Sequence, residues 1–240
     1  FLKTLKGVNH IFCQDQNSEK LLLSNGVDQV SVAGDTRFDR VKKLADSFTP
    51  VEKVEKWLNG RRAVVAGSTW PEDEKLIAEF MDKAPEDVAF LIAPHEIKAE
   101  KIDRLIKKLS EADQYTTWNS SDKPSRVLII DTIGLLGRLY HYGEVALIGG
   151  GFGSGIHNTL EATVYGTPVV FGPKHEKFRE AVGLKSLGAA FSVENQIDFE
   201  SIMIQLLNDD SFRRKAGEKA KRYVDTHAGA TEKILKEILN

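Results

Sequence analysis

Short apolar segments alternate with amphipathic helical segments through most of the chain, and this alternation limits the possible folds more than any other feature. The apolar segments are predicted to be strands, at 63–66, 88–92, 127–130, 145–148, 168–171 and 189–193. Helices are predicted between most of them, at 72–83, 96–110, 133–141, 157–165 and 175–187. Apolar strands separated by helices form a parallel sheet that is covered on both faces. The sequence therefore predicts an α/β fold with a Rossmann-like, doubly wound parallel sheet.

The two ends of the chain differ from this central pattern. A strand at 10–13, a helix at 18–24 and a strand at 30–32 form a smaller βαβ pattern near the start. The chain opens at Phe1, within this pattern, and we expect it to be a piece of a longer protein. The segment from Ile197 to Asn240 is helical in pattern, and its basic residues are typical of a solvated helix face, with a membrane contact as the alternative.

Composition excludes several classes of protein. The formal net charge is −2, which does not fit a general nucleic-acid binder, and no nucleic-acid partner is expected. A single cysteine, Cys13, excludes an internal disulfide framework. No apolar run approaches the roughly 20 residues that span a bilayer, so we expect this piece to be soluble.

A glycine-rich segment directly follows the predicted strand 145–148. Its sequence is Gly149-Gly150-Gly151-Phe152-Gly153-Ser154-Gly155. The helix predicted at 157–165 begins just after it, so backbone N–H groups and the positive end of a helix would converge there. This arrangement favours an anion, most naturally a phosphate. The alternative is a tight turn that only lets the strand pack closely against the helix.

Three polar residues begin that predicted helix. His157 and Asn158 precede Glu161 by four and three residues, which places all three on one rim. A carboxylate one turn into a phosphate-binding helix can accept hydrogen bonds from ribose hydroxyls, so the group indicates a nucleotide with something attached. His157 and Glu161 also have a spacing that can hold a metal ion, but a phosphate site of this kind needs no cation and we expect none.

Polar residues also follow three other predicted strands. Ser68 and Thr69 either cap the next helix, with Thr69 and Glu72 at capping-box spacing, or contact a ligand. Pro94 fixes a turn that could present backbone groups to a base, with His95 as a surface turn residue or a contact. Asp131, followed by Gly134 at the entry to a helix, either caps that helix or contacts a ligand.

In order along the chain, these segments resemble the 3-deoxy-D-manno-oct-2-ulosonic acid (Kdo) transferases. The resemblance is carried by Gln14-Asp15, Gly34-Asp35-Thr36-Arg37-Phe38-Asp39, Gly67-Ser68-Thr69, Asp131-Thr132-Ile133-Gly134, His157-Asn158-Thr159-Leu160-Glu161 and Phe171-Gly172-Pro173. These enzymes of lipopolysaccharide synthesis move Kdo from CMP-Kdo to a lipid A precursor at the cytoplasmic face of the bacterial inner membrane. Their fold is GT-B, in which two Rossmann-like domains face each other across a cleft.

The resemblance implies a division of this chain and a set of donor contacts. Residues 1–40 would be the end of the acceptor domain plus the linker, and 41–240 the donor domain, with the last helix packing back on the acceptor domain. The implied donor-binding residues are Ser68, Thr69, Pro94, His95, Asp131, Gly134, Gly149, Gly150, Gly151, Phe152, Gly155, His157, Asn158 and Glu161. Among them, the glycines at 149–151, Phe152 and Gly155 would surround the phosphate and sugar. Asn158 and Glu161 would contact the ribose and phosphate, Pro94 and its neighbours would meet the cytosine edge, and residues 131–134 would line the same pocket. No cofactor or metal is implied.

Two departures from the family pattern affect function. Many members carry Pro-Arg-His where this chain reads Pro94-His95-Glu96, so a cationic donor contact is missing there. The catalytic glutamate of the family lies in an acceptor-domain segment that these 240 residues do not contain. We therefore expect this piece to bind CMP-Kdo without transferring sugar, and the missing part to contact the membrane. The alternatives are a UDP-sugar GT-B glycosyltransferase, a sugar-nucleotide epimerase, and a non-catalytic interaction module.

Overall fold

The computed structural model describes residues 2–109 and 111–239, and its main body is a seven-stranded sheet. Positions 1, 110 and 240, which bound the predicted domains and the predicted helix 96–110, lie outside the described residues. All paired strands are parallel, in the order β5-β6-β4-β3-β7-β8-β9. The strands are β3 (Arg62–Thr69), β4 (Val88–Pro94), β5 (Ala112–Gln114), β6 (Val127–Ile129), β7 (Val145–Ile148), β8 (Val169–Phe171) and β9 (Ala190–Ser192). The predicted doubly wound α/β sheet is confirmed.

The strand order reverses at the centre of the sheet. Within the sheet the chain starts at β3, continues to β4, forms the edge strand β5 and then β6 between β5 and β4. It next crosses to β7 on the other side of β3 and continues to β8 and β9. In open parallel sheets ligands bind at the carboxyl ends of the strands, beside such a reversal. The point of reversal here lies at the ends of β3 and β7, where the backbone of Gly149 lies against that of Thr69.

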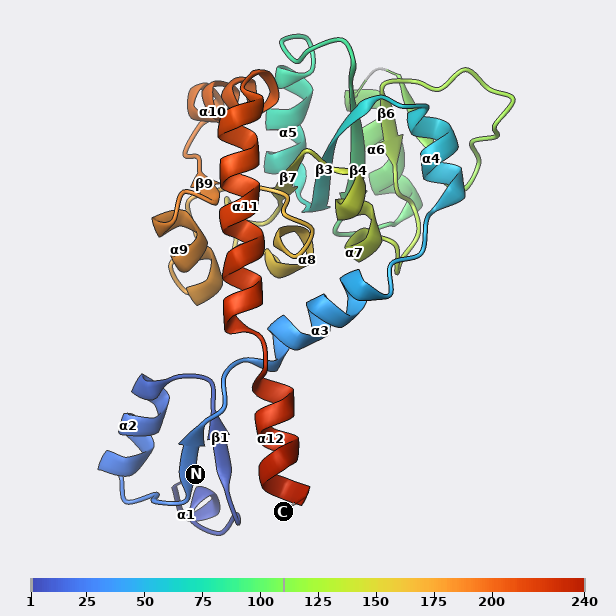
Figure 1. The fold of residues 1–240 in the computed structure, drawn as a ribbon. Helices are drawn as coiled ribbons and strands as arrows, with labels where there is room; N and C mark the ends of the chain where they lie inside the picture. Colours follow the sequence, from blue (N-terminus) through green and yellow to red (C-terminus); the bar gives the residue numbers. More distant parts are fainter. Residues whose placement is uncertain (1, 110, 240) are drawn as a thin grey trace.

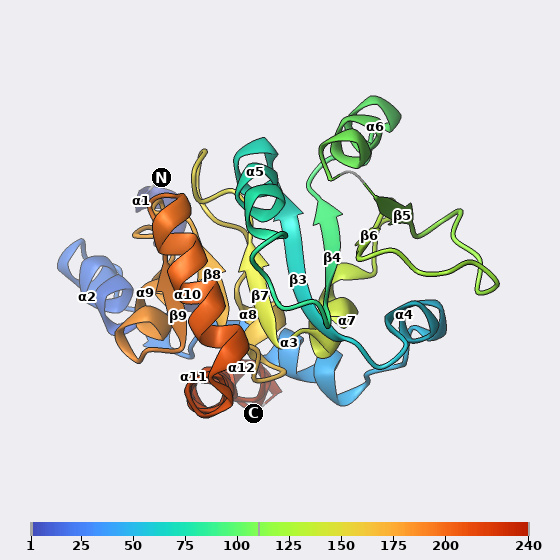
Figure 2. The same cartoon turned by 90° about the horizontal axis from the view of Figure 1, so that it is seen from above.

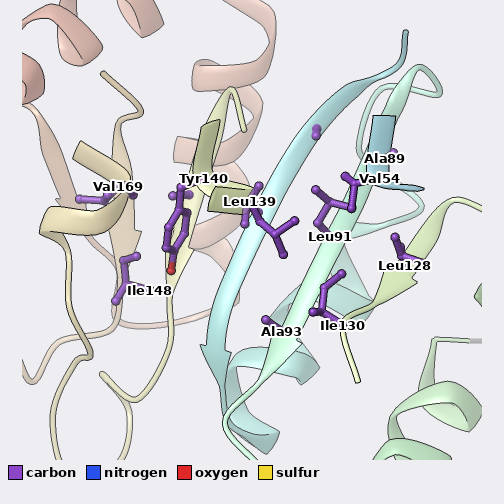
Figure 3. Close-up of a cluster of buried hydrophobic side chains, with 14 of the residues drawn as sticks. Val54, Ala89, Leu91, Ala93, Leu128, Ile130, Leu139, Tyr140, Ile148 and Val169 are labelled. Carbon is purple, nitrogen blue, oxygen red and sulfur yellow. The ribbon is translucent and has the colours of Figure 1, made fainter. Parts of the chain in front are cut away.

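Helices cover both faces of the sheet (Figure 2). One face carries α5 (Pro71–Phe80), α6 (Ala99–Lys108) and α10 (Gln196–Asn208). The other carries α4 (Glu52–Leu58), α7 (Leu136–Leu139), the 3-10 turn η1 (Tyr140–Tyr142), α8 (Leu160–Thr163), α9 (Arg179–Ser186) and α11 (Asp210–His227). Alternate strand residues enter the two cores. Figure 3 shows the second core, which contains the fully buried Leu91, Leu128 and Ile148 together with Tyr140.

The predicted helices are shorter than expected: α5 ends three residues before the end of the predicted 72–83, and α6 begins three residues into the predicted 96–110. The predicted helix 157–165 is the single turn α8, because the Asn158 side chain caps the Leu160 N–H at 3.0 Å and Gly166, with φ 77°, ends the turn. The predicted helix 133–141 is α7 followed by η1, and 175–187 contains only α9. The capping-box assignment of Thr69 and Glu72 is wrong: α5 begins after Trp70, whose N–H donates to the N3 carboxylate of Asp73 at 2.9 Å.

A smaller βαβ unit precedes the sheet. It contains α1 (Leu2–Leu5), β1 (Ile11–Cys13), α2 (Gln16–Ser24) and β2 (Val30–Val32), with β1 and β2 parallel. Helix α3 (Thr36–Asp46) leads from this unit to the sheet, and α12 (Ala230–Leu239) returns from α11 to lie beside β1 and β2 (Figure 1). The unit is therefore joined to the rest of the molecule by two stretches of chain.

Candidate functional site

The strand ends of β3 and β7 are in backbone contact. A Cβ atom on Gly149 would lie 2.2 Å from the Ser68 carbonyl oxygen, and one on Gly151 would lie 2.6 Å from the Gly172 nitrogen. No residue with a side chain fits at either position without moving backbone. Gly150 and Gly155 instead have positive φ, 92° and 139°, which lets the loop reverse. Close backbone packing therefore explains Gly149 and Gly151, whereas the reversal of the loop explains Gly150 and Gly155.

Ser68 is held in a left-handed conformation, with φ 53°. The register of β3 against β4 shifts between Gly67 and Thr69, so Ser68 is the extra residue of a bulge. Bulges and positive φ at a non-glycine residue cluster at functional sites, where surrounding contacts maintain the strain. Thr69 is buried behind the bulge, and its hydroxyl donates to Glu74 at 3.5 Å.

Asp73 is a buried acid at this site that the sequence did not identify as a site residue. Its Oδ2 accepts from the Trp70 N–H at 2.9 Å and from the Gly150 N–H at 3.0 Å, which fastens the glycine loop to the start of α5. Its Oδ1 has no hydrogen-bond partner among the described residues, and the side chain is 1% exposed. Burial raises the pKa of this carboxyl, against the effect of the two hydrogen bonds.

Three aromatic rings meet above the strand ends. The Trp70 and His95 rings stack at 4.5 Å between centroids, and the His95 and His157 rings at 4.6 Å. The Trp70 indole N–H lies 3.2 Å from Nε2 of His157. Burial, and then the neighbouring His95, lower the pKa of His157. The neutral imidazole therefore accepts from Trp70 through Nε2 and carries its proton on Nδ1.

Asn158 and Glu161 are paired as the spacing predicts. Asn158 Nδ2 donates to Glu161 Oε1 at 3.1 Å, and both side chains are half-buried. The backbone N–H groups of Asn158, Thr159 and Glu161 donate to no other described residue. The same short segment thus offers unpaired N–H donors and a carboxylate acceptor, which is the combination that a phosphate and a neighbouring hydroxyl would need.

Other predicted residues lie at the same edge of the sheet without joining this group. Asp131 accepts from the N–H of Thr116 at 2.9 Å and from its hydroxyl, so it ties down the loop after β5 and does not cap α7. Gly134 has φ 86° and open space around it. Pro94 is half-buried at the end of β4, where the exposed His95 donates its N–H to the Thr69 carbonyl at 3.0 Å. Neither Asp131 nor Gly134 bonds to the other predicted residues within the described chain.

Lys174 supports the glycine loop from the far side and was not predicted. Its Nζ donates to the Gly153 carbonyl at 2.6 Å, and its N–H donates to the Gly151 carbonyl at 2.9 Å. Phe152, half-buried, packs against Gly172 at the end of β8. A lysine directly after Gly172-Pro173 was the available signal, since a basic residue following a strand end often serves an adjacent loop or anion.

His157 and Glu161 face different partners, Trp70 and Asn158 respectively. Across residues 2–109 and 111–239, no three His, Cys, Asp or Glu side chains gather closely enough to hold a metal ion. None of the helices in the described part of the chain has the length and apolar character needed to cross a bilayer.

Comparison with known proteins agrees with the resemblance in the motifs. A 3-deoxy-D-manno-octulosonic acid transferase of Rickettsia typhi is 27% identical over 250 aligned residues, covering 100% of this chain and 53% of that protein. The transferase of the same name from Bordetella pertussis is 26% identical over 247 residues, covering 97% and 56%. No protein-family model matches the chain. The chain spans about half the length of the curated relatives it matches.

Solved structures share the fold. The C-terminal CMP-Kdo binding domain of WaaA from Acinetobacter baumannii superposes with a TM-score of 0.63 at 18% identity, over 79% of this chain and 99% of that domain. A UDP-N-acetylglucosamine 2-epimerase superposes with a TM-score of 0.67 at 16% identity, over 98% and 59%.

The parallel sheet and its point of reversal are thus shared, as a fold, with the CMP-Kdo binding domain from Acinetobacter baumannii and with the epimerase. The two curated relatives that match over 97–100% of this chain are both named 3-deoxy-D-manno-octulosonic acid (Kdo) transferases. The resemblance in the sequence motifs is thereby confirmed.

Proposed function

We propose that the chain is the donor-binding half of a Kdo transferase and that the strand-end site binds CMP-Kdo. The observation that carries this proposal is the Glu161 carboxylate beside the unpaired N–H groups of Asn158 and Thr159, at the edge of the sheet where its strand order reverses. The names of the curated relatives and of the structural neighbour from Acinetobacter baumannii support CMP-Kdo as the donor.

In this proposal, Glu161 accepts hydrogen bonds from the ribose and the free N–H groups hold the phosphate. Negative charge develops on the phosphate as CMP leaves the sugar, and backbone dipoles already aimed there stabilise it without reorganising. Asp73 keeps the glycine loop in place through Gly150, so its role is positioning. The group needs no metal ion for this work, since its donors are backbone N–H groups.

The rest of the reaction belongs to the whole protein. A base from the acceptor half would remove the proton from the acceptor hydroxyl, with inversion at the sugar carbon. The acceptor would be a lipid A precursor at the cytoplasmic face of the inner membrane. We propose that this chain alone binds the donor and transfers nothing; sugar transfer to a lipid A precursor by the purified chain would contradict this.

The test is a calorimetric titration of CMP and UMP into the purified chain. We expect CMP to bind more tightly than UMP, and Glu161→Ala to weaken CMP about tenfold or more, because a charged acceptor of ribose hydroxyls is lost. Glu72→Ala is the matched control, since Glu72 is an exposed acid on the neighbouring helix α5.

Each alternative predicts a different result in the same titration. Tighter binding of UMP would assign the chain to a UDP-sugar transferase or an epimerase. Binding of neither nucleotide would contradict the donor-domain proposal and favour a non-catalytic module.

A further inference from the structure

A cavity adjoins the ring cluster at Trp70. It has a volume of about 400 Å³ and opens between α5 and α6 at the ends of β3 and β4. Helices α5 and α6 cover one face of the sheet, whereas α8, which carries Glu161, covers the other. The lining includes Thr69 and Pro94 but neither Asn158 nor Glu161, so the cavity adjoins the strand-end site without including that pair. The residues that characterise its lining are Trp70, Pro94, Leu105, Lys101, Arg104 and Lys108.

Three basic side chains on one stripe of α6 line this cavity. Lys101, Arg104 and Lys108 are spaced by three and four residues, which places them above one another along the helix. Lys101 is paired with Glu96, and Lys108 donates to the Pro71 carbonyl at 2.9 Å. Two of the three cations are thus already held in place at the rim.

Arg104 is different, because its terminal nitrogens are unused. Its Nε donates to the Glu100 carbonyl at 3.2 Å within α6, and its Nη atoms form no hydrogen bond or ion pair within the described chain. A guanidinium presents a planar fork that matches a phosphate or a carboxylate. The cavity therefore has an oriented, unpaired anion ligand at its edge.

The remaining lining decides what kind of anion fits. Trp70, Pro94 and Leu105 provide apolar walls, so a ligand needs an apolar body as well as a charge. The acids are Glu96, which Lys101 neutralises, and Glu74, which accepts from the Thr69 hydroxyl. Burial raises the pKa of Glu74, although Lys108 opposes this. Three cations against two acids leave an excess of positive charge for a phosphate.

We propose that this pocket binds a phosphate monoester carried on a flat, apolar body, with Arg104 as its principal anion ligand. The inference rests on the proposed function, because Thr69 and Pro94 belong both to this lining and to the predicted donor contacts, whereas Asn158 and Glu161 belong to the donor site alone. Trp70 lies between the two sites, because it lines the pocket and its indole N–H contacts His157.

The test is an NMR titration that follows the indole N–H signals, with Trp70 assigned by Trp70→Phe. Trp57 and Trp118 are buried elsewhere and serve as internal references. We expect phenyl phosphate to shift the Trp70 signal and Arg104→Gln to weaken its binding about tenfold. Arg104→Lys should retain part of the affinity, and Lys107→Gln, which alters a residue of α6 outside the lining, should retain all of it.

Three comparisons sharpen the result. Inorganic phosphate that binds as tightly as phenyl phosphate would contradict the apolar body, and benzoate that binds as tightly would contradict the phosphate. No shift of the Trp70 signal, or full affinity in Arg104→Gln, would overturn the proposal. Repeating the titration in Glu161→Ala separates the sites: a CMP-induced shift that survives there, and is lost in Arg104→Gln, makes a nucleotide the source of the phosphate.

Discussion

The His157 ring couples the two ends of β3 and β7 at the scale of single residues. The ring accepts from Trp70 at the start of α5 and stacks on His95 after β4, and the backbone N–H of His157 donates to the Gly149 carbonyl at 3.1 Å. Protonation of the ring at Nε2 would remove the hydrogen-bond acceptor of the Trp70 indole N–H. The resulting positive charge would also lie against the His95 ring. The ring cluster is therefore organised around a neutral His157.

We predict that His157 makes the stability of the protein depend on pH. Its folded-state pKa is lowered by burial and by His95, so the unfolded chain binds the proton more tightly. Stability should fall as the pH drops below about 6.5, the ordinary histidine value, and this loss should end below the folded-state pKa. The measurement is the free energy of unfolding in urea at several pH values for the parent and for His157→Gln. An equally steep dependence in both proteins would contradict the prediction.

At the scale of elements, the glycine loop is fixed by backbone contact more than by side chains. Gly149 lies against Ser68, Gly151 lies against Gly172, and Asp73 and Lys174 hold the two ends of the turn. The loop is thus braced by β3, α5 and β8 together, and the N–H groups that follow it are presented on a rigid support.

Adding one methyl group at Gly149 should therefore destabilise the protein. Its Cβ would meet the Ser68 carbonyl at 2.2 Å, and we expect Gly149→Ala to lower the free energy of unfolding by about 2 kcal/mol or more. Gly153→Ala is the control in the same loop, because its Cβ would have its nearest contact at 3.6 Å. Urea denaturation of both variants measures the difference; equal stabilities would refute the close approach.

The strands could be predicted because each is continuously apolar, whereas β5 could not. Its residues Ala112, Asp113 and Gln114 are half-buried at the edge of the sheet, where a polar residue is tolerated. The sequence also predicted the Asn158–Glu161 pair, which depends on local spacing alone. These elements required no knowledge of distant contacts.

Tertiary contacts account for what the sequence did not predict at the site. Asp73 bonds Gly150, which is 77 positions away, and Thr69 and Glu72 had a capping spacing as plausible as that of Trp70 and Asp73. Asp131 accepts a hydrogen bond from Thr116, which lies just after the edge strand β5. No pattern within one segment encodes such pairs.

At the scale of the whole molecule, Asp39 connects helix α3, near the start of the chain, with helix α12, near its end. From α3 its carboxylate accepts the N–H groups of Gly229 and Thr231 and the Thr231 hydroxyl, at the start of α12. Burial alone would raise the pKa of Asp39, but these hydrogen bonds outweigh it and the pKa is lowered. The position of α12 beside β1 and β2 therefore depends on a residue almost 200 positions earlier.

We predict that Asp39→Asn loosens α12. An amide cannot accept through both of its terminal atoms, so at least one of the three hydrogen bonds is lost. Hydrogen–deuterium exchange of the amides in α12 should be about tenfold faster, while exchange in the central strands is unchanged. Asp46→Asn, at the exposed end of the same helix α3, is the control. Unchanged protection of α12 in Asp39→Asn would contradict the role of the tie.

The two stretches of chain that join the βαβ unit to the sheet run next to each other. Gly34 and Gly229 both have φ 110°, and a Cβ on Gly34 would lie 3.3 Å from that of Ala230. A change in the orientation of the unit against the sheet therefore requires backbone changes in both stretches, and it must break or follow the ion pair of Asp15 in the unit with Arg179 of α9.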